Sequence, residues 1–215
     1  MSFQVWLAFV AASTALLLIP GPTVLLVLTY AVSLGRRVAL TTALGVALGD
    51  FIAMSASLAG LGALVLASAQ LFVVIKWVGA AYLIWLGWNL FRSAGSNTAS
   101  VPDSDEKAAP PDKSSSGIFW HAAAVTALNP KGIVFFIAFV PQFVTPGSPI
   151  LLQFVVLIVT FVTLAAVNAL AYALLGDRIG SSLMAPNAMR RLQRAGGSTL
   201  VAMGLSTAAF VRASN

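Results

Sequence analysis

The sequence predicts an all-α, polytopic membrane protein in which six transmembrane helices form two inverted three-helix repeats. The first observation is composition: of 215 residues, 59% are hydrophobic and 8% are charged, whereas soluble domains contain about 25% charged residues. The second is distribution, because nearly all charged residues fall between apolar blocks long enough to cross a bilayer, which takes about 20 residues. The third is a polar segment that separates these blocks into two groups of three.

The apolar blocks are taken in chain order, and each is predicted to span the membrane. They cover approximately residues 3–34, 38–67, 70–91, 118–143, 149–175 and 196–211. Residues 1–35 contain no Lys or Arg, so we expect the first block to remain as a permanent span and not to be cleaved as a signal peptide.

The polar segment at residues 93–116 is rich in Ser, Pro, Ala and charge. It has too few large apolar side chains to pack, which predicts a flexible linker. The chain therefore divides into a first repeat at 1–92, a linker at 93–116 and a second repeat at 117–215.

The positions of Lys and Arg predict the orientation in the membrane. Two lie on one side, Lys76 and Arg212, and nine lie in the odd-numbered loops and the linker: Arg36, Arg37, Arg92, Lys107, Lys113, Arg178, Arg190, Arg191 and Arg194. Because cytoplasmic loops carry the excess of positive charge, these loops should be cytoplasmic and both termini outside. Three spans per repeat then place the second repeat upside down relative to the first.

Several function classes do not fit the composition. The net charge of +6 arises from basic residues at block ends, so it does not indicate nucleic acid. With no Cys and one His, we expect no disulfides, no metal site and no cofactor. A membrane-embedded enzyme would need an activated nucleophile or a metal set, and the sequence offers no Cys, one His and no paired carboxylates inside the blocks.

The first block contains an interruption at its centre, Pro20-Gly21-Pro22-Thr23. Each proline removes a backbone donor and clashes with the carbonyl one turn earlier. Backbone groups freed in this way cannot face lipid, because an unsatisfied group there is costly. They must face protein, water or a ligand. A simple proline kink is the alternative.

The fourth block contains a second interruption in the matching place, VTALNPKGIVFFIAF at residues 125–139. Paired interruptions at corresponding positions are typical of a transporter's central site, which is built from half-helix ends near the midplane. We therefore predict a substrate-binding site that includes Pro20, Gly21, Pro22, Thr23, Asn129, Pro130 and Lys131.

Three polar residues inside the blocks complete the predicted site. Asp50 is the acidic residue deep in a block, where a charge costs about 2.5–3.5 kcal/mol, so we expect it to couple transport to protons. Its alternative role is structural. Lys131 is the matching cation, unless its side chain extends to the interface. Asn168 is predicted to bind substrate as the uncharged counterpart of Asp50.

A small-residue motif, GVALG at Gly45 to Gly49, permits close helix packing. The sequence leaves open whether that packing lies within one chain or in a homodimer.

Four stretches resemble a known family: PGPTVLLVLTYAVSLGRR, LGVALGD, WVGAAYLIWLGWNLFRS and LNPKGIVFFIAFVPQF. In order and spacing they are similar to the LysE/RhtB (lysine exporter) family of amino-acid translocators over nearly the whole chain, excluding the linker. The resemblance implies a multi-pass protein of the bacterial inner membrane that exports amino acids or close derivatives, driven by the proton gradient. It assigns no firm role to individual residues, although both interruptions and Asp50 match the family's motifs.

The resulting hypothesis is an exporter that works by alternating access and proton antiport. Its partners would be a small amino acid or derivative, protons and membrane lipids. A zwitterion would place its carboxylate at the half-helix that starts at Pro22, assisted by Lys131, and its ammonium at Asp50. The alternatives are a passive small-solute channel and a membrane scaffold that transports nothing.

Overall fold

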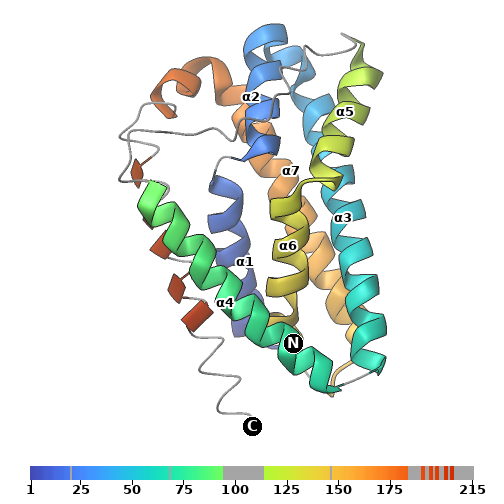
Figure 1. The fold of residues 1–215 in the computed structure, drawn as a ribbon. Coiled ribbons are helices and arrows are strands. Elements are labelled where there is room, and N and C mark those ends of the chain that lie inside the picture. The colour runs from blue at the N-terminus through green and yellow to red at the C-terminus, as the bar shows by residue number, and fades with distance from the viewer. Residues whose placement is uncertain are drawn as a thin grey trace.

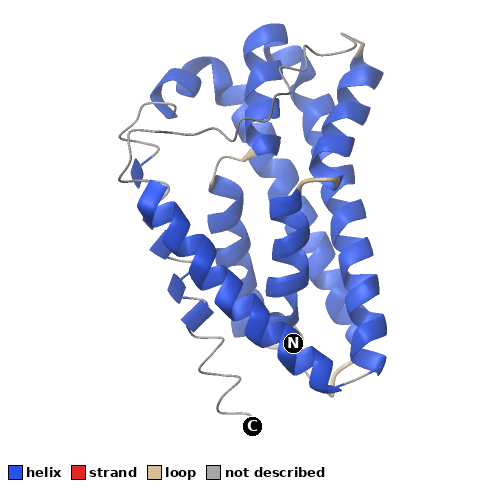
Figure 2. Ribbon diagram, in the orientation of Figure 1, coloured by secondary structure: helices blue, strands red, loops and turns tan. Residues whose placement is uncertain are grey.

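The computed structural model describes residues 1–19, 21–67, 69–93, 114–145 and 147–183, and the short stretches 190–191, 194–195, 197–198, 201–202 and 204–205. Every regular element within these ranges is a helix (Figure 2), which confirms the all-α prediction. Pro20, residues 94–113 of the linker and much of the sixth block lie outside the described residues.

The helices follow the predicted blocks closely. In chain order they are α1 (Phe3–Leu18), α2 (Pro22–Leu34), η1 (Gly35–Val38), α3 (Ala39–Ala67), α4 (Ala69–Ser93), α5 (Ser115–Ala127), α6 (Pro130–Phe139), η2 (Val140–Phe143) and α7 (Ile150–Leu183). In Figure 1, α1 and α2 follow one another upward through the bundle, whereas α5 and α6 follow one another downward. Helices α3 and α7 extend over the length of both pairs, in opposite directions. The two interrupted blocks therefore run antiparallel.

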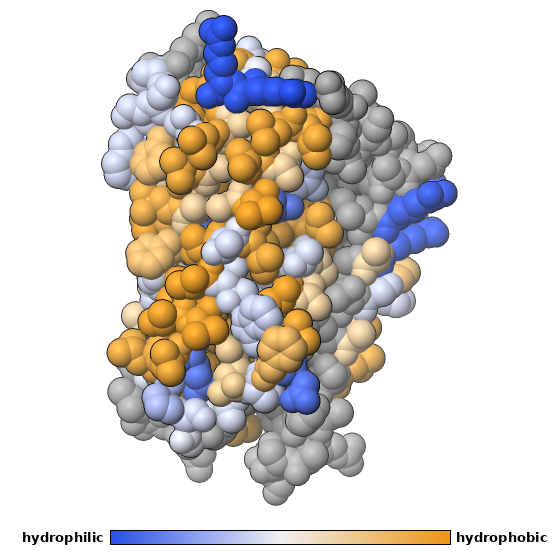
Figure 3. All heavy atoms as spheres, turned by 180° about the vertical axis from the view of Figure 1, so that it is seen from behind, coloured by the Kyte–Doolittle hydropathy of each residue, from blue (hydrophilic) through white to orange (hydrophobic). Residues whose placement is uncertain are grey.

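The long apolar helices fit a bilayer. Among the described residues, Pro22–Gly62 and Ile150–Leu175 are long and apolar enough to cross a membrane. The bent pair Ser115–Ala127 and Pro130–Phe143 would make a third span, with an angle of 47° between its parts. Figure 3 shows hydrophobic side chains over much of the coloured part of one face, with hydrophilic atoms at the upper end and some lower down. Such a large apolar surface is rare on a soluble protein and is suited to lipid.

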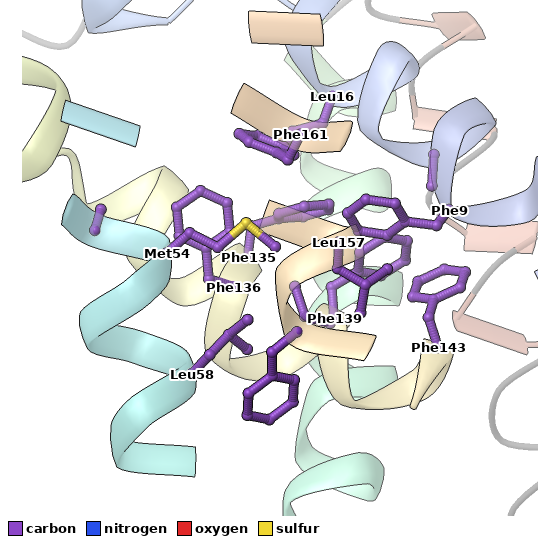
Figure 4. Packing of buried hydrophobic residues seen from close by; sticks show 14 of the residues in the cluster. Phe9, Leu16, Met54, Leu58, Phe135, Phe136, Phe139, Phe143, Leu157 and Phe161 are labelled. Carbon is purple, nitrogen blue, oxygen red and sulfur yellow. The ribbon is translucent and has the colours of Figure 1, made fainter. Parts of the chain in front are cut away.

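Aromatic side chains make up much of a buried hydrophobic cluster between the helices (Figure 4). Their rings pack mostly edge to face or tilted, for example Phe136 against Phe161 with centroids 4.8 Å apart. Edge-to-face pairs contribute about 0.5–1.5 kcal/mol beyond the area they bury. The cluster joins α1, α6, η2 and α7 through Phe9, Phe135, Phe136, Phe139, Phe143 and Phe161.

The GVALG motif packs within the chain. A Cβ atom on Gly45 would lie 2.5 Å from the carbonyl oxygen of Phe119, and one on Gly49 would lie 2.5 Å from that of Ala123. Both glycines thus let α3 touch the backbone of α5, the first part of the interrupted fourth block. The motif is accounted for without a dimer.

Candidate functional site

The first interruption is a complete helix break. Helix α1 ends at Leu18, Ile19 has an extended backbone, and α2 begins at Pro22 after Gly21. Proline at the first helical position suits a helix start, because its missing N–H would have no intrahelical partner there. The predicted break is therefore present, with Gly21 and Pro22 in it.

Lys131 contacts the exposed end of α1. Its ammonium Nζ donates to the carbonyl oxygen of Ile19 at 2.9 Å and to that of Leu16 at 3.3 Å. The last carbonyls of a helix carry a partial negative charge, so a cation is favoured at this end. The snorkelling alternative is wrong, because the side chain points into the first break instead of toward the membrane surface.

Helix α7 supplies the remaining bonds to the same end. The Asn168 side-chain amide donates to the carbonyl of Leu17 at 3.1 Å, and the Tyr172 hydroxyl donates to that of Leu18 at 3.1 Å. With Lys131, these side chains satisfy the carbonyls of four consecutive residues, 16–19. The freed backbone groups of α1 thus face protein side chains.

The second interruption contacts the first. Asn129 caps α6, because its side-chain oxygen accepts a hydrogen bond from the Lys131 backbone N–H at 3.1 Å. Its side-chain nitrogen donates to the Thr23 hydroxyl, also at 3.1 Å. Thr23 is in the first turn of α2 and accepts a second bond, from the Thr126 hydroxyl, at 3.5 Å. One asparagine therefore ties the start of α6 to the start of α2.

Replacing Asn129 by Ala is expected to lower both stability and transport. The lost cap costs about 0.5–2 kcal/mol, and the bond between the two breaks is lost as well. Ser114→Ala is the matched control, because Ser114 caps α5 through Gly117 N–H at 3.1 Å, at the opposite end of α5 from the break. The Tm should fall in both variants, and further in Asn129→Ala, which loses the bond to Thr23 as well as a cap. Transport should fall clearly only in Asn129→Ala, and equal transport in the two variants would contradict this role.

A cavity of about 60 Å³ lies between the two breaks. A volume of about 10–15 Å³ is enough to admit one water molecule, so this cavity has room for a few waters. Apolar side chains from α1, α2, α3 and α7 form much of its wall. The polar side chains that line it are Thr23, Asp50, Asn129, Lys131, Asn168 and Tyr172.

Asp50 is the carboxylate of this cavity. It is 7% exposed, and within the described part of the chain no hydrogen bond or ion pair to its carboxyl group occurs. Lys131 lines the same cavity but forms no ion pair with Asp50. A charge held away from water without a partner is unfavourable, so this arrangement suits a ligand that supplies the missing partner.

The start of α2 adds donors. Gly21 precedes it without any side-chain cap, so the first-turn N–H groups keep the hydrogen-bonding capacity and positive dipole end of a helix N-terminus. Gly21, Thr23 and Val24 all line the cavity. The cavity thus has donors on one wall and a carboxylate on another.

The structure brings together most of the predicted site. Gly21, Thr23, Asn129, Lys131 and Asn168 line the cavity with Asp50. Pro22 and Pro130 start the helices beside it, and Pro20 lies outside the described residues. Sequence reasoning missed Tyr172. Spacing could have identified Tyr172, because it follows Asn168 by four residues and therefore lies on the same face of the helix.

Comparison with known proteins identifies the family. The profile of the LysE type translocators matches residues 14–209. The chain belongs to the LysE type translocator family. It is 35% identical over 204 residues to the homoserine/homoserine lactone efflux protein of Salmonella typhimurium, covering 95% of this chain and 96% of that protein. It is 31% identical to the leucine efflux protein of Klebsiella pneumoniae over 147 residues, 66% of each chain. No solved structure matches.

Membership of the LysE type translocators confirms the resemblance found in the motifs. The matched region of this LysE translocator begins inside α1 and includes both helix breaks and every polar residue of the cavity. An uncharacterized membrane protein of Vibrio cholerae, 33% identical over 205 residues, spans 95% of this chain and 97% of its own length. The family is one of translocators, which indicates a transporter and not an enzyme.

Proposed function

We propose that this LysE translocator exports small zwitterionic amino acids or close derivatives, such as homoserine, by proton antiport across the bacterial inner membrane. The observation that carries the proposal is the cavity between the helix breaks, where Asp50 and Lys131 face the same space without pairing. The relatives named as efflux proteins for homoserine and leucine support the substrate class.

A zwitterion would complement the two charges. Its carboxylate accepts from the α2 first-turn N–H groups and from Lys131, while its ammonium donates to Asp50. Hydrogen bonds to charged groups contribute about 1.5–3 kcal/mol each. A substrate with an additional charge would leave that charge unmatched in a cavity that offers one anion and one cation. Small neutral side chains fit the apolar wall.

Proton coupling follows from the single carboxylate. Asp50 can hold either the substrate ammonium or a proton, and each ligand excludes the other. Protonation from the acidic outside releases the cargo there, and deprotonation on the inside restores the binding form. Each turnover then exchanges one bound species for the other, which is antiport.

The inverted-repeat architecture, with both termini outside, is part of this proposal. The opposite directions of α1–α2 and α5–α6, and of α3 and α7, support it (Figure 1). A further contact joins α4 to the sixth block, where a Cβ on Gly204 would lie 2.8 Å from the carbonyl oxygen of Ala80. Rocking of one repeat against the other around the cavity would give alternating access.

Efflux from proteoliposomes tests the function. Vesicles loaded with labelled homoserine should empty faster than protein-free vesicles, and faster again when the outside is made acidic. Loss of the label should be slower when lysine or glutamate replaces homoserine. If the protein is a passive channel, the efflux rate should not depend on the pH gradient. If it is a scaffold, efflux should not exceed that of protein-free vesicles. Either result would reject antiport.

A further inference from the structure

Lys131 holds the broken end of α1 from the side of α6. It is the second residue of α6, and its ammonium bonds to the carbonyls of Leu16 and Ile19. Asn168 and Tyr172 hold the same end from the side of α7. Helix α1 is therefore attached at its break to two different elements through separate hydrogen bonds.

We propose that Lys131 is a latch between α6 and α1 that the carboxylate of the cargo releases, an inference that rests on the proposed function. In the empty protein the ammonium bonds to α1. When a carboxylate enters the cavity, the ammonium transfers to it, and α1 separates from α6 while remaining attached to α7.

Relative acceptor strength favours this transfer. The carbonyls of Leu16 and Ile19 are neutral acceptors, whereas a carboxylate adds the attraction between two full charges to its hydrogen bond with the ammonium. Lys131 is also in the first turn of α6, where a positive charge opposes the helix dipole. Its favourable interactions come from outside α6, so a better external partner can move it.

The transfer has a continuous path. An ammonium group has three donors, and carbonyls occupy two of them in the structure. A carboxylate can therefore bind the third donor before the bonds to α1 break. The lysine stem passes beside Gly21, which has no side chain to obstruct it; a Cβ atom there would lie 3.5 Å from Lys131 Cδ.

When the Lys131 ammonium leaves α1, the end of α1 keeps only its other hydrogen bonds. The carbonyl of Leu16 keeps a bond from the Ile19 N–H at 3.2 Å, and the carbonyls of Leu17 and Leu18 keep their bonds from α7. The links from α1 to α7 survive while the Lys131 link to α6 is lost. Cargo binding would thus loosen one side of the cavity selectively, and an empty site would stay closed on that side.

Paired spin labels can measure this movement, because the chain contains no Cys. Leu7→Cys on α1 and Ile137→Cys on α6 report the predicted separation, since both side chains are exposed, at 45% and 41%. Leu7→Cys with Val159→Cys on α7, 59% exposed, is the matched control. Distances between the labels are measured by pulsed electron paramagnetic resonance in lipid bilayers, without ligand, with homoserine and with 3-aminopropan-1-ol. The last compound retains the ammonium of homoserine but lacks its carboxylate.

The latch predicts a specific pattern. Homoserine should lengthen the α1–α6 distance, 3-aminopropan-1-ol should not, and the α1–α7 distance should stay constant. Lys131→Met should show the long α1–α6 distance without any ligand. An unchanged ligand-free distance in Lys131→Met would overturn the latch, whatever the substrate. If the wild-type distances respond to neither ligand and the protein transports no homoserine, the proposed substrate is wrong. The comparison of wild type with Lys131→Met, both without ligand, would still show whether the latch exists.

A second variant covers the case in which Lys131→Met does not fold. Asn168→Leu removes a bond from α7 and leaves Lys131 in place. It should loosen α1 from α7 and leave the ligand-free α1–α6 distance short. A lengthened α1–α6 distance in Asn168→Leu would contradict the separate attachments on which the latch depends.

Discussion

Asp50→Asn should remove the response of efflux to a pH gradient and lower the rate about 10- to 100-fold, since a lost bond to a charged group is worth about 1.5–3 kcal/mol. The amide has nearly the same shape, but it cannot take up a proton or neutralise the substrate ammonium. Homoserine efflux from proteoliposomes, measured with and without an acidic exterior, gives both quantities.

The control for Asp50→Asn is a buried polar residue on the same helix. Thr42 is fully buried, bonds to the carbonyl of Val38 at 2.7 Å, and does not line the cavity. Thr42→Val should retain the pH response and most of the rate. If Asp50→Asn behaves like this control, Asp50 does not carry the proton.

Gly49→Leu should destabilise the protein strongly, because α3 and α5 touch at this residue. A Cβ atom alone would lie 2.5 Å from the Ala123 carbonyl oxygen and 2.6 Å from Thr126 Cβ, and leucine adds three more carbons. Overpacking costs about 1–3 kcal/mol, which corresponds to a Tm lower by roughly 2–12 °C in a chain of this size. The shift should also misplace the second break and abolish transport.

Gly60→Leu is the matched control for Gly49→Leu. Gly60 lies on the same helix, and a Cβ there would have no atom within 4 Å. Helix propensity favours leucine over glycine by almost 1 kcal/mol, so Gly60→Leu should leave Tm unchanged or slightly higher. Thermal unfolding in detergent, followed by tryptophan fluorescence, compares the two. Equal Tm values would show that α3 and α5 are not in close contact at Gly49.

The helix breaks could be predicted from sequence because proline acts locally. Pro22 and Pro130 remove backbone donors wherever they stand, and both begin new helices in the structure. The partners of the freed carbonyls could not be predicted, because they come from residues more than 100 positions away along the chain. For the same reason the sequence predicts that Lys131 binds substrate or extends to the interface, and it does not predict the bonds to α1.

Helix ends were predicted well where backbone geometry sets them. Helix α2 ends at Leu34 before Gly35, whose φ of 73° suits glycine, and the first block was expected to end there. Helix α7 instead continues to Leu183, past the block end at residue 175. Hydropathy along the sequence indicates where the apolar, lipid-facing part of a helix ends. The helix itself can continue beyond that point with polar residues. The partner of GVALG depended on tertiary packing, which the motif alone does not specify.

In the proposed antiport cycle the protein would return to the inside without an amino acid, and the hydrogen bonds at the end of α1 would favour that step. Because side chains of the protein itself satisfy the carbonyls of residues 16–19, the empty protein leaves none of these polar atoms bare inside the bilayer. The proposed carrier would therefore not need cargo to satisfy these carbonyls during its return. Purified protein should accordingly remain folded in the absence of any amino acid.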